Sequence, residues 1–272
     1  MLGAIIGDIV GSIYEFHNHR WKAFELFNKK CFFTDDTVIT CAVADSLNRK
    51  NGDDVVKTMK EFGRAYPGKG YGAHFGSWLF SSDTKPYYSF GNGAAMRISP
   101  VAWIANSEEE VKFLSKKITE VTHDHPEGLK GAEVTAMCIF KALQGGGDYK
   151  TTREEIRKYA EEQYPEIKRM NYMDLVNNYK FNETCQNTVP QAIYCFLISK
   201  NFEDCLRTSV SIGGDTDTLC AISCAIAEAF YGIPKQFKKE VLKYFTSRDR
   251  QMLLAPINEI YKRYGINNYI PL

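Results

Sequence analysis

Apolar residues recur along this chain at the three- and four-residue spacing of amphipathic helices, whereas the strict alternation of a half-buried strand is hard to find. The spacing predicts helices over residues 34–47, 53–66, 107–121, 126–143, 151–164, 189–198, 202–212 and 215–231, and one or two more over 242–264. Gly232 and Pro234 should end the helix over 215–231, and Pro256 should interrupt the last stretch. The pattern therefore predicts an all-α protein.

Two stretches outside these helices differ in character. Residues 145–150 are predicted to be a flexible connector, after which Thr151 and Glu154 match the capping box that opens a helix. Residues 68–92 are rich in glycine, serine and aromatic residues, which indicates a long loop region with room for one helix. Long loops in a helical protein are where functional residues gather.

The composition is that of an ordinary globular protein. The 272 residues are 44% hydrophobic and 25% charged, which excludes a disordered, collagen-like or disulfide-scaffold chain. Lysine and arginine number 34 and aspartate and glutamate 33. The resulting net charge of +1 argues against nucleic acid or an anionic membrane as the main partner.

Cysteine spacing and the apolar runs bear on the compartment. None of the 8 cysteines forms a C-x-x-C pair or has zinc-site spacing, so we expect buried thiols in a reducing compartment. Residues 1–11 lack the basic region of a signal peptide, and the longest apolar run, Leu219–Ala227, is too short to span a bilayer. We therefore expect a cytoplasmic protein with no membrane partner.

Two predicted helices begin with clustered acids. Asp35 and Asp36 follow Thr34 at the first, and Asp215 and Asp217 open the second, with threonines beside them. Helix capping alone explains acids at such positions. In both cases, however, two carboxylates and at least one hydroxyl share a single turn, and the helix that follows is unusually apolar.

The helix over 215–231 looks central. Leu219, Ile222, Ile226 and Phe230 mark one apolar face, and the other faces carry small residues. Acids at its start would then be partly buried, where an unpaired carboxylate is destabilising and a cation relieves it. Oxygen ligands without histidine or cysteine select Mg²⁺, Mn²⁺ or Ca²⁺ rather than zinc. If the two acidic starts face each other, their charge suits two metal ions.

Residues 7–15 contain a third acidic site. Gly11 lies one turn after Asp8 and should leave space beside it, and Glu15 closes the segment. Glu15 could equally be an ordinary surface residue at a helix end, and the nearby His17 and His19 fit surface positions better than ligand positions.

The turn at residues 89–93 is a candidate anion site. Gly91 and Gly93 would let backbone N–H groups approach a diphosphate, although such a turn is often only a tight turn. Aromatic residues nearby could stack on a base or belong to the core: Tyr71, Phe75, Tyr87, Tyr88 and Phe90. Arg97 is either a structural ion-pair partner or a phosphate ligand. His123 would contact a ligand rather than a metal.

Taken in order, six segments resemble the ADP-ribosylglycohydrolase family, which includes dinitrogenase reductase-activating glycohydrolase. They are GDIVGSIYE (7–15), FTDDTVITCAVADSL (33–47), YGAHF (71–75), SFGNGAAMRISPVAW (89–103), THDHPEGLKGAEVTA (122–136) and SIGGDTDTLCAI (211–222). The resemblance implies that residues 1–272 form one compact, single-domain orthogonal helical bundle of that family's type.

The resemblance also implies roles for individual residues. It implies two Mg²⁺ ions, with Mn²⁺ as a substitute, bound by Thr34, Asp35, Asp36, Asp215, Asp217 and Thr218. Glu15 would lie on a mobile flap near the metals and, with Asp35, Asp36 and Asp217, would be catalytic. The ADP part of the substrate would be held by Ser89, Phe90, Gly91, Asn92 and Gly93, with His123 at the adenosine end.

The activity implied is hydrolysis of the C1″ glycosidic bond in ADP-ribosylated proteins or small ADP-ribose conjugates, with release of ADP-ribose. The ring would pass through an oxocarbenium-like state. Either Glu15 or a metal-linked aspartate would orient the water. Residues 148–183 match no family segment and could shape access for the acceptor.

Two other functions stay open. One is a catalytically silent, ADP-ribose-binding or crystallin-like member, which the presence of every metal-type acid disfavours. The other is a metal phosphohydrolase that cleaves the diphosphate. The sequence does not choose among arginine, serine, O-acetyl and nucleic-acid acceptors, and the near-neutral charge weighs against the last.

Overall fold

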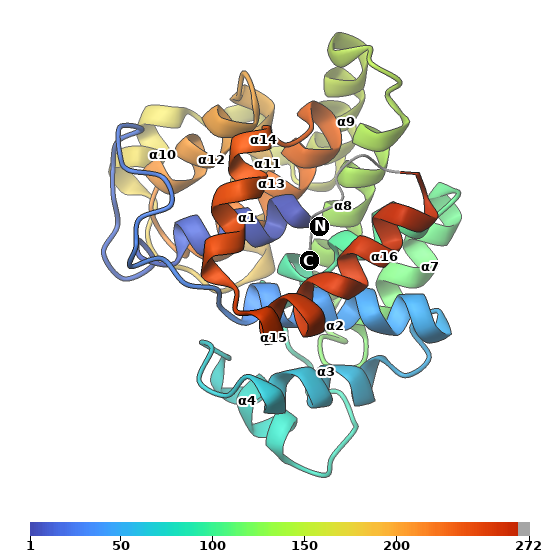
Figure 1. Cartoon of the computed structure of the whole chain (residues 1–272). Coiled ribbons are helices and arrows are strands. Elements are labelled where there is room, and N and C mark those ends of the chain that lie inside the picture. The colour runs from blue at the N-terminus through green and yellow to red at the C-terminus, as the bar shows by residue number, and fades with distance from the viewer. Residues whose placement is uncertain (266–272) are drawn as a thin grey trace.

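The computed structural model describes residues 1–265. All the secondary-structure elements in that range are helices (Figure 1). The α-helices are α1 (Leu2–Gly11), α2 (Asp35–Lys50), α3 (Val55–Ala65), α4 (Ala73–Phe80), α5 (Gly93–Met96), α6 (Ser99–Ile104), α7 (Glu108–Thr119), α8 (Pro126–Gln144), α9 (Tyr149–Gln163), α10 (Tyr172–Asn178), α11 (Cys185–Ile198), α12 (Phe202–Ser211), α13 (Thr216–Tyr231), α14 (Lys235–Val241), α15 (Ser247–Asp249) and α16 (Ala255–Arg263). Shorter helical segments are η1 (Pro165–Arg169), η2 (Leu242–Tyr244) and the π-helical η3 (Arg250–Leu254). The all-α prediction is confirmed.

Several predicted boundaries differ from the structure by one to four residues, among them the starts of α9 and α11. Helix α9 begins at Tyr149 because the side chain of Asp148 accepts a hydrogen bond from the Thr151 amide (3.1 Å). Thr151 and Glu154 therefore lie inside the helix and form no capping box. Helix α11 begins at Cys185 rather than at residue 189, and Pro190 lies within it.

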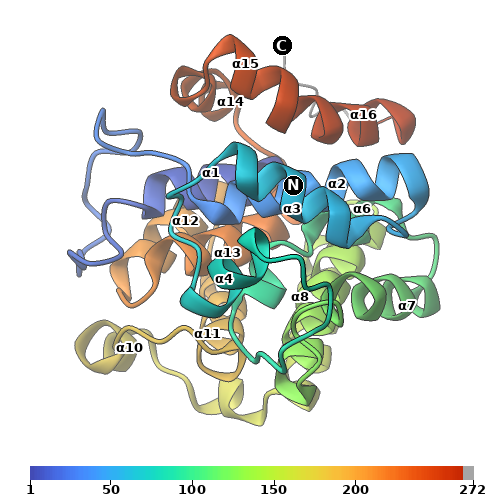
Figure 2. The same ribbon diagram turned by 90° about the horizontal axis from the view of Figure 1, so that it is seen from below.

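Helix α13 lies in the interior with α1 along it, and this pair makes the most extensive helix contact of the described chain (Figures 1 and 2). The close approach depends on glycines of α1. A Cβ atom added at Gly7 would lie 2.3 Å from the Cys220 carbonyl oxygen, and one at Gly11 would lie 2.5 Å from that of Thr216. Gly11 therefore makes room for the start of α13, and not for Asp8 as the sequence suggested.

The remaining helices enclose this pair. Helices α8, α11 and α12 pack on α13, while α2 packs on α3, α6 and α16. Figure 2 shows α14, α15 and α16 as a layer outside α1 and α2. All eight cysteines are buried and unpaired, as predicted. Within residues 1–265, every helix is too short or too polar to cross a membrane.

Candidate active site

Asp8 fixes the start of α2. Its buried carboxylate accepts hydrogen bonds from the amides of Thr34 (2.9 Å) and Thr37 (3.1 Å) and from both of their hydroxyl groups. Thr34 itself is the N-cap of α2 and accepts from the Asp36 amide (3.3 Å). Long-range bonds from α1 therefore hold this turn, and Asp8 has a structural role that the sequence did not reveal.

The two acidic helix starts meet in space. One oxygen of Asp36, Oδ2, accepts hydrogen bonds from Thr34 (3.4 Å) at the start of α2 and from Thr218 (3.3 Å) in the first turn of α13. The other oxygen of Asp36 is buried and has no hydrogen-bond partner. The two chain segments that carry the predicted metal ligands thus face one another.

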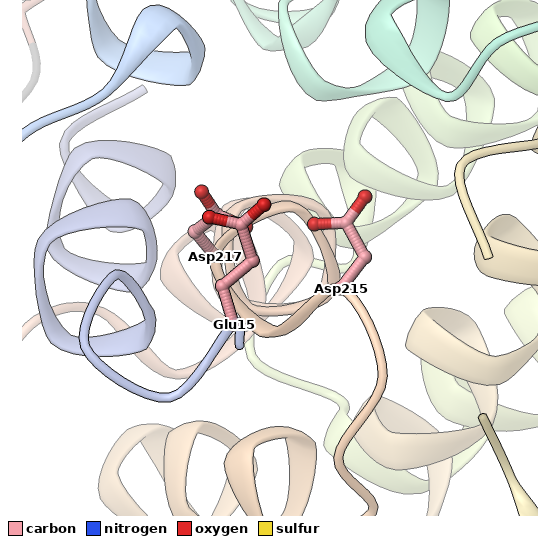
Figure 3. Close-up of side chains that lie close together, drawn as sticks. All are labelled: Glu15, Asp215 and Asp217. Carbon is pink, nitrogen blue, oxygen red and sulfur yellow. The ribbon is translucent and has the colours of Figure 1, made fainter. Parts of the chain in front are cut away.

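Glu15 joins the acids of α13. Carboxylate oxygens of Glu15, Asp215 and Asp217 lie within 4.8 Å of one another, a spacing that could hold a metal ion. Figure 3 shows these carboxylates converging at the N-terminal end of α13, with Glu15 reaching in from the segment that follows α1. Asp215 is the N-cap of α13 but makes no capping bond. Capping therefore does not account for its side chain.

Burial dominates the electrostatics of the cluster. It raises the pKa of Asp35, Asp36 and Asp217 well above the usual range, and the neighbouring carboxylates raise these pKa values further. The same causes raise the pKa of Asp215 to about 6 and that of half-buried Glu15 to about 8. No cation of the described chain forms an ion pair with these carboxylates, so the repulsion between their like charges is not offset.

The turn at residues 89–93 is connected to this cluster. The side-chain amide of Asn92 donates to Asp215 (2.6 Å), while its backbone amide donates to the Glu183 carbonyl (2.7 Å). The Gly91 amide donates to the hydroxyl of Ser89 (3.2 Å). These two backbone N–H groups are thus used within the protein, so an anion held here needs other donors as well.

His123 supplies such a donor. Its Nδ1 accepts from the Thr122 hydroxyl (2.8 Å) and faces a guanidinium N–H of Arg97 (3.4 Å). Since arginine only donates, we assign the ring proton of neutral His123 to Nε2. That nitrogen faces Gly91 and Gly93, at which added Cβ atoms would lie 3.6 Å and 3.5 Å from it. The glycines therefore leave open the space in front of the ring.

Arg97 forms no ion pair with an acid of the described chain. It is fully buried, donates to the Thr122 hydroxyl (2.6 Å) and has an Nε atom without a partner. Burial lowers its pKa to about 10. Burial, and next the charge of Arg97, lower the pKa of His123, which keeps that ring neutral. The sequence left open whether Arg97 is an ion-pair partner, and the structure removes that interpretation.

One cleft of about 480 Å³ contains nearly every predicted site residue. Its lining includes the acid set Glu15, Thr34, Asp35, Asp36, Asp215, Asp217 and Thr218, and the second set Ser89, Gly91, Asn92, Gly93 and His123. Phe90 lies outside the lining, with its ring packed on His125 and 42% exposed. Of the aromatic candidates, Phe75 and Tyr87 line the cleft.

The lining also includes residues that the sequence did not predict, two of which tie distant segments to the cleft. Glu183 follows α10, in a stretch that matched no family segment, and Lys69 belongs to the glycine-rich loop before α4. The carbonyl of Lys69 accepts from the Asp35 amide (2.8 Å), which ties this loop to the start of α2. Neither residue carries a local signal, because its position depends on contacts between distant parts of the chain.

A family model described as ADP-ribosylglycohydrolase matches residues 1–265. The chain belongs to the ADP-ribosylglycohydrolase family. Its members are glycohydrolases, so the chain is assigned to a family of enzymes. The resemblance drawn from the six sequence segments is thereby confirmed.

Named relatives agree with this assignment. The chain is 28% identical to ADP-ribosylhydrolase ARH3 of Mus musculus, covering 86% of this chain and 83% of that protein. It is 27% identical to ADP-ribosyl-[dinitrogen reductase] glycohydrolase of Rhodospirillum rubrum, covering 85% and 84%. A solved structure named ADP-ribosylglycohydrolase-related protein complex superposes with a TM-score of 0.69 at 22% identity, covering 97% and 95% of the two chains. That likeness supports the fold.

Proposed function

We propose that this protein is a magnesium-dependent ADP-ribosyl hydrolase that cleaves the C1″ glycosidic bond of ADP-ribosylated proteins or small ADP-ribose conjugates. The observation that carries the proposal is the contact of Asp36 with Thr218, which joins two distant acidic helix starts in one cleft. The bond from Asn92 to Asp215 connects this acidic end to the turn proposed to hold ADP.

The acidic end has the donor chemistry of a magnesium site. Its ligand atoms are all carboxylate or hydroxyl oxygens, and Asp36 keeps one buried oxygen without a partner. We propose that two Mg²⁺ ions, or Mn²⁺ in their place, are held by Thr34, Asp35, Asp36, Asp215, Asp217 and Thr218. When bound, the metal supplies positive charge that orients the ribose hydroxyls and stabilises the transition state.

Other residues of the chain would bind the substrate and transfer the proton. Ser89, Asn92 and the Nε2–H of His123 bind the ADP part, while Gly91 and Gly93 leave space for it. Glu15 lies beside Asp215 and Asp217. Burial and then the neighbouring acids raise its pKa, and once bound metal offsets those acids, Glu15 would be ionised and accept the proton of the attacking water. Asp35, Asp36 and Asp217 would hold the metal ions beside the proposed position of the ribose. As the C1″ bond to the acceptor breaks and the bond to the water oxygen forms, the acceptor leaves with the proton that Glu15 received.

We further propose that residues 1–272 form one domain and that the protein acts in the cytoplasm on ADP-ribosyl substrates rather than on nucleic acid or membranes. The net charge of +1 supports such substrates over a polyanionic partner.

The experiment is a hydrolysis panel with and without Mg²⁺. Purified protein is given arginine-linked, serine-linked, O-acetylated and nucleic-acid-linked ADP-ribose, and products are identified by mass spectrometry. We expect intact ADP-ribose from at least one linkage in Mg²⁺ and none in EDTA. Binding of ADP-ribose without turnover would indicate the silent member, and AMP as product would indicate a diphosphate hydrolase.

A further inference from the structure

Asn18 fastens the segment that carries Glu15 to the turn before α13. Its side-chain N–H groups donate to the carbonyls of Tyr14 (2.8 Å), Glu15 (3.0 Å) and Gly214 (3.0 Å). Its side-chain oxygen accepts from the Gly214 amide (2.9 Å). The side-chain amide of Asn18 therefore bonds both the N–H and the carbonyl of Gly214, and it also bonds the carbonyl of Glu15, the proposed base.

Arg20 makes a second set of bonds from the same segment. Its guanidinium donates to the carbonyls of Ile212, Val176 (3.1 Å) and Tyr179 (2.9 Å), and to the side-chain oxygen of Asn18 (3.3 Å). A Cβ atom added at Gly213 would lie 2.5 Å from the Arg20 Cζ atom, so the guanidinium is seated directly against that turn. These bonds reach both the end of α12 and the end of α10.

The stretch after α10 also packs on the segment that carries Glu15 and on the turn before α13. The ring of Tyr179 packs on Gly214, where an added Cβ atom would lie 2.3 Å from it, and its hydroxyl donates to the Asn187 carbonyl (2.6 Å). The ring of Phe181 stacks on that of Phe16, with centroids 5.7 Å apart. Phe16, the neighbour of Glu15, and the turn before α13 are therefore held by a part of the chain that matched no family segment.

We propose that Asn18 and Arg20 are positioning residues that hold Glu15 at the acidic end of the cleft before substrate binds. The inference rests on the proposed function, since it assigns a purpose to the geometry of Glu15. It also assigns residues 176–181 the role of an anchor for the Glu15 segment. Neither side chain contacts the proposed substrate position, since neither lines the cleft.

The first test compares Asn18→Ala and Arg20→Ala with His17→Ala. His17 is exposed, belongs to the same segment and makes none of these bonds, so its variant is the matched control. Hydrogen–deuterium exchange of peptides covering residues 12–20 should become about fivefold faster or more in the first two variants, with or without metal. In the control, exchange should stay as in the wild type throughout. In the other two variants, the only further change should be at the bonding partners, residues 176–179 and 212–214.

The second readout is kinetic. With Mg²⁺, kcat should fall about tenfold or more in Asn18→Ala and Arg20→Ala, because a displaced base lowers the rate of the chemical step. KM and the affinity for ADP should stay within about twofold, since the hydrogen bonds of Asn18 and Arg20 go to none of the residues proposed to bind ADP. Arg20→Lys should recover part of kcat, because an ammonium group can still donate to one or two of the carbonyls.

A double-mutant cycle separates positioning from general packing. If Asn18 acts through Glu15, then adding Asn18→Ala to Glu15→Gln should change residual turnover by less than about twofold. Additive losses, unchanged exchange at residues 12–20, or unchanged turnover in Glu15→Gln would each overturn the inference. If no substrate of the panel is hydrolysed by the wild type, the proposed function fails, while the exchange experiment still decides whether Asn18 and Arg20 hold the segment.

Discussion

The cleft has an acidic end, lined by Glu15, Asp35, Asp36, Asp215 and Asp217, and an end proposed to hold ADP, lined by Ser89, Gly91, Asn92, Gly93 and His123. The two ends differ in charge and in how far their polar groups are already hydrogen-bonded. At the acidic end, burial raises the pKa of the carboxylates above the usual range, and Asp36 keeps an oxygen without a partner. At the ADP end, His123 is neutral and its Nδ1 is satisfied by Thr122. On the proposed function, the acidic end is completed by a cation, whereas the end proposed to hold ADP is already formed without one. Changes at the first end should affect catalysis and pH dependence, and changes at the second should affect affinity.

The largest effect should come from Asp36→Asn. Asp36 contributes an unpartnered buried oxygen and joins α2 to α13 through Thr218, so its loss should lower kcat at least about 100-fold. Affinity for ADP measured in EDTA should change by less than about twofold. Asp148→Asn, at an exposed helix start far along the chain from both acidic helix starts, is the control and should keep wild-type turnover. A comparable loss of ADP affinity in Asp36→Asn would contradict the division into two ends.

The second prediction concerns stability and pH. A carboxyl group whose pKa is raised on folding stabilises the protein below its unfolded pKa near 4, and this contribution is lost as the pH rises through the folded value. In EDTA, the melting temperature of the wild type should therefore fall relative to that of Asp36→Asn between pH 4 and 8. At pH 8 the variant should melt at least about 2 °C higher, and the two should converge near pH 4.

Adding Mg²⁺ should reverse that order at pH 8. The metal stabilises the ionised wild-type cluster, and its affinity rises with pH because the ligands must be deprotonated. Circular dichroism melts across the pH range, with Mg²⁺ or EDTA, measure both effects. Equal pH profiles for the wild type and the variant in EDTA would show that folding does not raise the pKa of Asp36.

Much of the acidic end was predictable because its residues carry local signals. Paired acids with hydroxyls at the starts of apolar helices pointed to Asp35, Asp36, Asp215 and Asp217, and all four line the cleft. Glu183 was not predictable, since it reaches the cleft only because the residues beside it pair with the turn at 90–92. A backbone pairing between distant segments leaves no periodic pattern in either one.

Asp8 shows that a local signal can also suggest a site residue where the structure has a structural one. Its position beside Glu15 in the sequence suggested a third acidic site, yet its carboxylate is saturated by four donors from Thr34 and Thr37. An acid that caps a distant helix and an acid that awaits a cation look alike in the sequence. Only the count of donors around each oxygen separates them.

At the end proposed to hold ADP, His123→Ala should weaken ADP binding about 10- to 150-fold, the range expected for losing a hydrogen bond to a charged ligand group. Turnover at saturating substrate should change by less than about threefold, because the hydrogen bonds of His123 go to Thr122 and Arg97 and not to Glu15 or a proposed metal ligand. Isothermal titration with ADP and steady-state kinetics give the two values. A large fall in kcat with unchanged affinity would place His123 in the chemical step instead.

The smallest effect should come from Phe90→Ala, and it tests where the lining of the ADP end stops. The family resemblance assigned Phe90 to ADP binding, but its ring packs on His125 outside the lining while its carbonyl accepts from the Cys185 amide (2.9 Å). The substitution keeps that backbone bond, so ADP affinity should change by less than about twofold, whereas His123→Ala lowers it. If Phe90→Ala weakens ADP binding as much as His123→Ala does, the ring must turn toward the ligand on binding. The ADP end would then be assembled by its ligand, and the contrast with the acidic end would disappear.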